Sequence, residues 1–96
     1  MVAPEGPARD SSFATFRIQL VAVSSEQRAQ RALADYRDRF ADILREEYLL
    51  MDKANGANGW LYRVQYGPLS FAKAQILCTE LKQREQPCLV KAAMTQ

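Results

Sequence analysis

Two short stretches decide the fold of this chain: Phe16–Leu20, which reads FRIQL, and Tyr62–Tyr66, which reads YRVQY. In both, large apolar residues alternate with an arginine and a glutamine, in the same order. Strict alternation over five residues is typical of a β-strand with one buried face. The arginine and glutamine of each stretch are therefore predicted to face away from the core, and so is Val21, the next residue in the first run.

Each of these strands is followed by a segment with helical spacing. After the first, the Ser-Ser pair at 24–25 offers a helix cap, and apolar residues recur at helical spacing over 29–43 for roughly five turns. After the second, Ser70 is the candidate cap of another helix, and Pro87 marks its end. The two halves of the chain therefore share a strand-helix pattern, which the FRIQ and YRVQ repeat supports.

Two more strands complete the pattern. Residues 46–53, rich in Tyr, Leu and Met, are predicted to form a strand that leads into the turn at Asn55–Gly59. Gly67-Pro68 is predicted to end the strand that begins at Trp60, and Cys88–Ala92 is predicted to be the last strand. The order β-α-β-β-α-β predicts an α+β fold of the ferredoxin-like type. Its four-stranded antiparallel sheet carries both helices on one face.

Length and composition predict a single domain. The chain has 96 residues and a net charge of +2, short of the dense positive field of a duplex-DNA binder. Residues 1–13, with Pro4, Gly6 and Pro7, are predicted to be a flexible linker or tail, and residues 14–94 the domain. No apolar run approaches the roughly 20 residues that span a bilayer, so we expect no membrane contact by this domain itself.

The outward residues of the two matching strands predict one polar patch. In a ferredoxin-like sheet the first and third strands are central neighbours, which would gather four side chains in the middle of the open face: Arg17, Gln19, Arg63 and Gln65. Solvent-facing strand positions are often simply polar, which is the alternative interpretation. Two arginines and two glutamines nevertheless supply many hydrogen-bond donors and suit a ligand rich in hydroxyl or carboxylate groups.

The reactive side chains argue against catalysis. The chain has no histidine, so a Ser-His or Cys-His nucleophile pair is excluded, and two cysteines alone make no zinc site. Glu46 and Glu47 would point to opposite faces of a strand and do not form a glycosidase pair. Cys78 and Cys88 are predicted to lie between helix and sheet, either as a disulfide or as two buried thiols. We expect no enzyme, no metal and no cofactor.

The two halves resemble those of a SPOR domain, a sporulation-related repeat found in bacterial modules that bind septal peptidoglycan. The resemblance rests on FRIQLVAVSS, residues 16–25, and on YRVQYGPLSFAKAQILCTELKQREQPCLVKA, residues 62–92. The most telling part is the Arg-Val-x-x-Gly-Pro core that starts at Arg63. The resemblance covers about residues 14–93 and implies the same β-α-β-β-α-β fold.

The resemblance also implies a ligand: peptidoglycan glycan strands denuded of their stem peptides, bound at the division septum through the open sheet face. Gln19 matches the glutamine of the family's first strand, and Arg63 and Gln65 match outward positions of the Arg-Val-x-x-Gly-Pro strand. Trp60 resembles a tryptophan that follows a turn in some members. It is predicted either to stack on a sugar, a role also open to Tyr48, or to plug the edge of its strand.

In chemical terms, stripping the stem peptides exposes lactyl carboxylates, which Arg17 and Arg63 would each meet in a charge-assisted bond. The chain departs from the family where Val21–Val23 replaces a common Gly-Ser-Phe, which removes a serine hydroxyl from the site. The family implies a periplasmic location, as part of a membrane-anchored or exported bacterial protein. We expect a monomer.

Two other functions fit the same element order. An RNA-binding domain of this fold also uses its open sheet face, but it stacks bases on exposed aromatic residues of the central strands. Here Tyr62 and Tyr66 share the buried parity, so no nucleic acid is expected. A domain that only binds other proteins is the second alternative.

Overall fold

The computed structural model of the protein describes residues 15–92. Its four strands form one antiparallel sheet in the order β3-β4-β2-β5. The α+β fold with β-α-β-β-α-β order is thus confirmed, while the predicted tail at residues 1–13 lies outside the described residues. The elements along the chain are β2 (Phe16–Val23), α1 (Glu26–Arg39), the 3-10 turn η1 (Glu46–Tyr48), β3 (Leu49–Gly56), β4 (Gly59–Leu69), α2 (Phe71–Gln83) and β5 (Leu89–Ala92).

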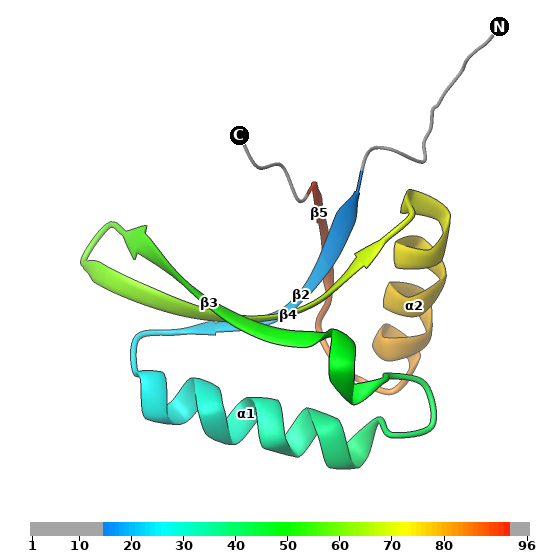
Figure 1. The fold of residues 1–96 in the computed structure, drawn as a ribbon, viewed down its shortest axis with the longest axis horizontal. Helices are drawn as coiled ribbons and strands as arrows, with labels where there is room; N and C mark the ends of the chain where they lie inside the picture. Colours follow the sequence, from blue (N-terminus) through cyan, green and yellow to red (C-terminus); the bar gives the residue numbers. More distant parts are fainter. Residues whose placement is uncertain (1–14, 93–96) are drawn as a thin grey trace, which may run out of the picture.

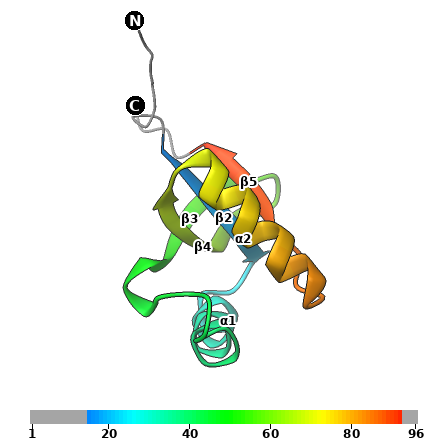
Figure 2. The same ribbon diagram turned by 90° about the vertical axis from the view of Figure 1, so that its right-hand side faces the viewer.

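Both helices pack on one side of the sheet. Figure 1 shows α1 running beneath the strands and α2 at the end of the sheet opposite the β3–β4 turn, and Figure 2 shows the same arrangement from the side of α2. One hydrophobic core joins the helices to the sheet. Its buried residues are Ile18, Leu20, Ala29, Tyr36, Phe40, Leu44, Val64, Tyr66, Ala74, Cys78, Leu81 and Cys88.

Serine side chains begin both helices, as predicted. The Ser25 hydroxyl accepts a hydrogen bond from the backbone N–H of Arg28 at 3.3 Å, and the Ser70 hydroxyl accepts one from that of Lys73 at 3.1 Å. α1 has 14 residues, about four turns, and is shorter than its apolar spacing predicted because Phe40 leaves the helical conformation. None of the helices within residues 15–92 has the length and apolar character needed to cross a bilayer.

Two strand boundaries differ from the prediction. Residues 46–48 form a 3-10 turn, so β3 starts at Leu49 rather than Glu46. The Tyr66 hydroxyl accepts a hydrogen bond from the backbone N–H of Arg45 at 2.9 Å, and this bond holds the chain outside the ladder just before the turn. Gly67-Pro68 does not end β4, because pairing with β2 resumes at Leu69 after a shift of register.

A β-bulge in β2 changes which residues face the core. Gln19 pairs with Gln65, but the next pair is Val21 with Val64, so Leu20 is the extra residue. The alternation reverses at this point, and the prediction that Val21 faces outward is wrong: it packs against the core. Ala22 consequently takes the outward position instead.

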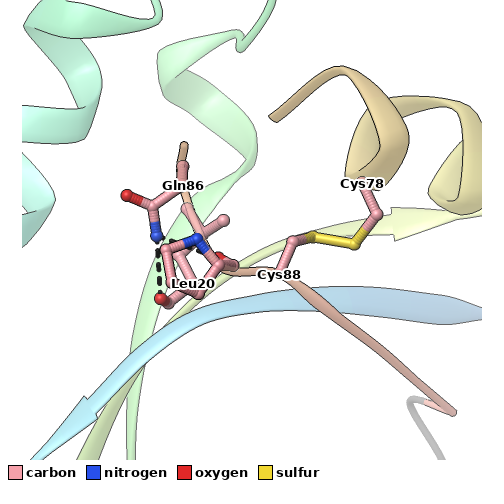
Figure 3. The surroundings of a disulfide bond; sticks show 5 residues. Leu20, Cys78, Gln86 and Cys88 are labelled. Atoms are coloured by element: carbon pink, nitrogen blue, oxygen red, sulfur yellow. Dashed lines mark hydrogen bonds between the residues drawn. A yellow bond between two sulfur atoms is a disulfide. The ribbon is translucent and has the colours of Figure 1, made fainter. Parts of the chain in front are cut away.

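A buried glutamine supports the bulge. The extra residue of a bulge is left out of the regular ladder, and the Leu20 carbonyl accepts a hydrogen bond from Gln86 Nε2 at 3.0 Å (Figure 3). The same Nε2 donates to the Pro87 carbonyl at 2.9 Å and lies 3.4 Å from the Tyr36 hydroxyl. Gln86 therefore ties the segment after α2 to the middle of β2.

A disulfide links α2 to the start of β5. Cys78 and Cys88 are joined with their Cα atoms 5.4 Å apart, and both residues are buried (Figure 3). Of the two arrangements that the sequence left open, the structure has the disulfide rather than two thiols. A crosslink that closes a loop of this size stabilises a fold by about 2–3 kcal/mol.

Candidate functional site

The open sheet face gathers four of the five predicted site residues. β2 and β4 are central neighbours, and their register sets Gln19 directly beside Gln65. Arg17 lies on the same face of β2, two residues before Gln19, and Arg63 lies on the same face of β4, two residues before Gln65. No helix of the described residues covers this face (Figure 1).

Gln65 connects its neighbours rather than facing solvent. Arg17 Nη1 donates to Gln65 Oε1 at 3.0 Å, and Gln65 Nε2 donates to Gln19 Oε1 at 3.2 Å. Gln65 is only 3% exposed, so it lies beneath the surface that the sequence predicted it would form. Its amide orients the side chains of Arg17 and Gln19, which are the partly exposed members of this chain of hydrogen bonds.

Asp52 is a member of the site that the sequence analysis missed. Arg63 Nε and Nη2 donate to the two Asp52 carboxylate oxygens, each at 2.7 Å, and Arg17 Nη1 lies 3.7 Å from Asp52 Oδ2. The sequence did contain a pattern that could have located Asp52. A two-residue turn pairs Gly56 with Gly59, and counting back along that hairpin places Asp52 opposite Arg63.

The charged side chains of this cluster shift one another's pKa values. The hydrogen bonds from Arg63 lower the pKa of Asp52 below its ordinary value of 3.8, and the positive charges of Arg17 and Lys91 act in the same direction. Partial burial of the carboxylate opposes this effect. The bond to Asp52 in turn raises the pKa of Arg63. Asp52 is therefore a carboxylate at neutral pH and keeps Arg63 in a fixed position.

A close approach of the backbone positions Arg17. A Cβ added to Gly67 would lie 2.9 Å from the Phe16 carbonyl oxygen and 3.0 Å from Arg17 Cγ. Only glycine at this position lets the stem of Arg17 lie against β4. The glycine of the Gly67-Pro68 step thus has a direct role in shaping the site.

We define the open-face patch as Arg17, Gln19, Asp52, Arg63 and Gln65. Beside it, on β5, Lys91 lies opposite Arg17, and Leu89 lies opposite Gln19. Neither was foreseen, because the sequence alone does not show the register of β5 against β2. The described strands thus place three cations and one carboxylate on the open face. No group of three His, Cys, Asp or Glu residues within 15–92 is arranged to hold a metal ion.

Trp60 is the one predicted site residue that the structure does not bring to the patch. It pairs with Asn55 near the turn and has the same parity as Tyr62, which points to the helix side of the sheet. The Lys53 ammonium lies 4.4 Å from the centre of the Trp60 ring, which is half exposed. Trp60 therefore forms a separate cation–π cluster near the end of the β3–β4 hairpin.

Tyr48 also lies away from the patch. Its ring packs edge-on against that of Tyr66, 5.8 Å between centroids, on the helix side of the sheet. It lines a cavity of about 660 Å³ between α2 and the segment that precedes β3. The other residues around this cavity are Ile43, Arg45, Tyr66, Pro68, Leu69, Ser70, Lys73, Ile76, Leu77 and Glu80.

Comparison with known proteins identifies one family. The model of the SPOR domain matches residues 12–91, which is most of the chain. No curated protein and no solved structure matches the chain. The matched region contains every described strand and helix, apart from the last residue of β5.

Proposed function

The chain belongs to the SPOR domain family, and we propose that it is a non-catalytic module that binds denuded peptidoglycan glycan strands through its open-face patch. SPOR domains bind septal peptidoglycan, and this chain shares the family's fold. The observation that carries the proposal is the hydrogen-bonded series Arg17–Gln65–Gln19 in the middle of an uncovered sheet face. We therefore assign the glycan to this face.

The patch suits a sugar chain chemically. The Gln19 amide can donate to and accept from hydroxyl and acetamido groups, and Arg17 supplies charged donors beside it. Both side chains are held by the buried Gln65, so part of their conformational freedom is lost before a ligand arrives. Preorganisation of this kind lowers the entropic cost of binding.

The cellular compartment that we propose for this domain is based on its family. SPOR domains occur in periplasmic cell-division proteins. We propose that this domain lies in the periplasm, as part of an exported or membrane-anchored protein, and binds the glycan as a monomer. Contact with the membrane and any catalysis would then belong to other parts of the protein.

The open face does not fit the RNA-binding alternative. Base stacking needs aromatic rings on the outer face of the central strands. The outward positions of β2 and β4 at the patch are arginines, glutamines and Ala22, whereas Tyr66 is buried in the core on the helix side. The patch offers hydrogen bonds where an RNA-binding sheet offers stacking surfaces.

Binding to purified sacculi tests the proposal. The wild-type domain is expected to sediment with sacculi, and more of it after amidase treatment has removed the stem peptides. Gln19→Glu is expected to reduce sedimentation about tenfold, because the new carboxylate competes for Arg17 and repels anionic ligand groups.

The matched control is Gln75→Glu, which makes the same change at an exposed position of α2. It is expected to bind like the wild type. The proposal fails if wild-type protein does not sediment with sacculi, and retention on single-stranded RNA in the same assay would favour the alternative function.

A further inference from the structure

Two cations lie on neighbouring strands at the edge of the open-face patch. Arg17 on β2 and Lys91 on β5 are directly opposite partners in the antiparallel ladder, so their side chains leave the same face of the sheet. Cβ atoms of such a pair are about 5 Å apart, and like charges in this arrangement destabilise a sheet. The pair is therefore unfavourable unless an anion lies between or above the two side chains.

Asp52, the only carboxylate of the open face among the described strands, fills that role only in part. Both Asp52 oxygens accept hydrogen bonds from Arg63 at 2.7 Å, whereas its nearest approach to Arg17 Nη1 is 3.7 Å. Lys91 is exposed and makes no ion pair within residues 15–92. Three cations thus share one carboxylate, so the β2–β5 side of the patch keeps a net positive charge.

The two arginines differ in what they can still bind. Arg63 uses Nε and Nη2 on Asp52, so its fork is occupied. Within residues 15–92, Arg17 donates a hydrogen bond only from Nη1, to Gln65, which leaves its Nε and Nη2 donors available toward the open face. The sequence predicted that each arginine would bind one ligand carboxylate, and we now expect this of Arg17 alone.

We propose that Arg17 and Lys91 form a carboxylate subsite that receives the free lactyl carboxylate of a sugar in the denuded glycan. This inference rests on the proposed function. Arg17 Nε and Nη2 donate to the carboxylate, and the Lys91 ammonium reaches it from the neighbouring strand. In an intact glycan strand the same lactyl carboxyl is bound to the stem peptide as an amide. The amide carries no charge, and the peptide adds bulk. The subsite therefore explains a preference for stripped glycan.

Leu89 adds an apolar wall to this subsite. It lies on the same face of β5 as Lys91, two residues earlier, and opposite Gln19. Its side chain is 59% exposed, an unusual position for a leucine beside a polar patch. A lactyl or acetamido methyl group beside the bound carboxylate would cover it.

The test compares two soluble ligands: denuded glycan oligosaccharides, and the same oligosaccharides with their carboxylates converted to methyl amides. The wild-type domain is expected to bind the charged form about tenfold more tightly, as for a charge-assisted hydrogen bond. Lys91→Gln is expected to reduce that preference to about threefold and to leave binding of the methyl amide unchanged. Lys91→Arg is expected to keep the wild-type preference.

Lys82→Gln is the matched control, since it removes the same charge from an exposed position of α2 on the other side of the domain. It is expected to keep the tenfold preference. Equal wild-type affinity for both ligands, or the same loss in both lysine variants, would overturn the subsite while leaving the proposed function intact. Wild-type protein that binds neither ligand would instead contradict the proposed function.

Discussion

At the scale of single residues, position within the patch decides what each side chain does. Gln19 and Gln65 belong to the same repeat, yet Gln65 is buried and orients its neighbours, whereas Gln19 remains accessible. Arg17 and Arg63 are equivalent in sequence too, but Arg63 is held by Asp52. The residues that we propose contact the glycan are therefore one member of each pair, Gln19 and Arg17, together with Lys91.

The Asp52–Arg63 pair predicts a pH dependence of stability. The pKa of Asp52 is lower in the folded state than its ordinary value of 3.8. The stabilisation from the Asp52 carboxylate is therefore complete when the pH is well above 3.8, and it is lost as the pH falls through the lower pKa of the folded state. The urea midpoint of the wild type should fall more steeply below pH 4 than that of Asp52→Asn. At pH 7 the variant should be less stable by about 1 kcal/mol or less, because the pair is partly exposed.

Asp38→Asn removes an exposed helix carboxylate that makes no ion pair within residues 15–92, and it serves as the comparison. Its urea midpoint should follow the pH in parallel with the wild type. Identical curves for the wild type and Asp52→Asn would show that the ion pair contributes nothing to stability in acid.

At the scale of elements, the bulge in β2 shapes the open face. Without it, Val21 would be exposed and Ala22 would face the core. With it, Ala22 lies opposite Arg63, and Ala22 is the position at which the resemblance described in the sequence analysis implies a serine. The missing hydroxyl would therefore have lain at the rim of the patch, which ties the departure at Val21–Val23 to the binding surface.

Gln86 is predicted to stabilise this bulge. Gln86→Leu leaves the Leu20 carbonyl without its side-chain donor in a buried position, which should cost about 1–3 kcal/mol of unfolding free energy. Urea unfolding followed by circular dichroism measures the loss. Gln83→Leu, at the exposed end of α2, should unfold like the wild type, and equal effects of the two changes would argue against a specific role for Gln86.

At the scale of the whole molecule, the sheet separates two surfaces of different character. The helix side contains the core, the Trp60–Lys53 cluster and the cavity lined by Tyr48. The open side contains the polar patch and its β5 neighbours. The disulfide ties α2 to the start of β5, so the strand that carries Lys91 is anchored to the core side of the domain.

This separation predicts where a ligand perturbs the domain. Denuded glycan oligosaccharides titrated into ¹⁵N-labelled protein should shift backbone amide resonances of β2, β4 and β5 around Arg17, Gln19 and Lys91. Amides around the helix-side cavity, such as that of Ile76, should stay in place. Shifts centred on the cavity instead would place the glycan on the opposite side of the sheet.

The sequence by itself determined the element order, the serine cap before each helix and the placement of Gln19 and Gln65 on one face of the sheet. Each depends on local patterns: alternation in a strand, a serine before a helix, and a repeat that sets two halves in the same frame. It also led to the right family, because the Arg-Val-x-x-Gly-Pro core lies within a few residues of chain.

Only the tertiary structure decided the rest. The bulge at Leu20, the burial of Gln65 and the opposition of Arg17 to Lys91 all depend on which strand lies beside which, and in what register. Register is set by the packing of the whole core and by contacts between residues far apart in the chain, such as Gln86 with Leu20. A strand shows its own alternation, but the neighbour that completes a binding site lies on another strand.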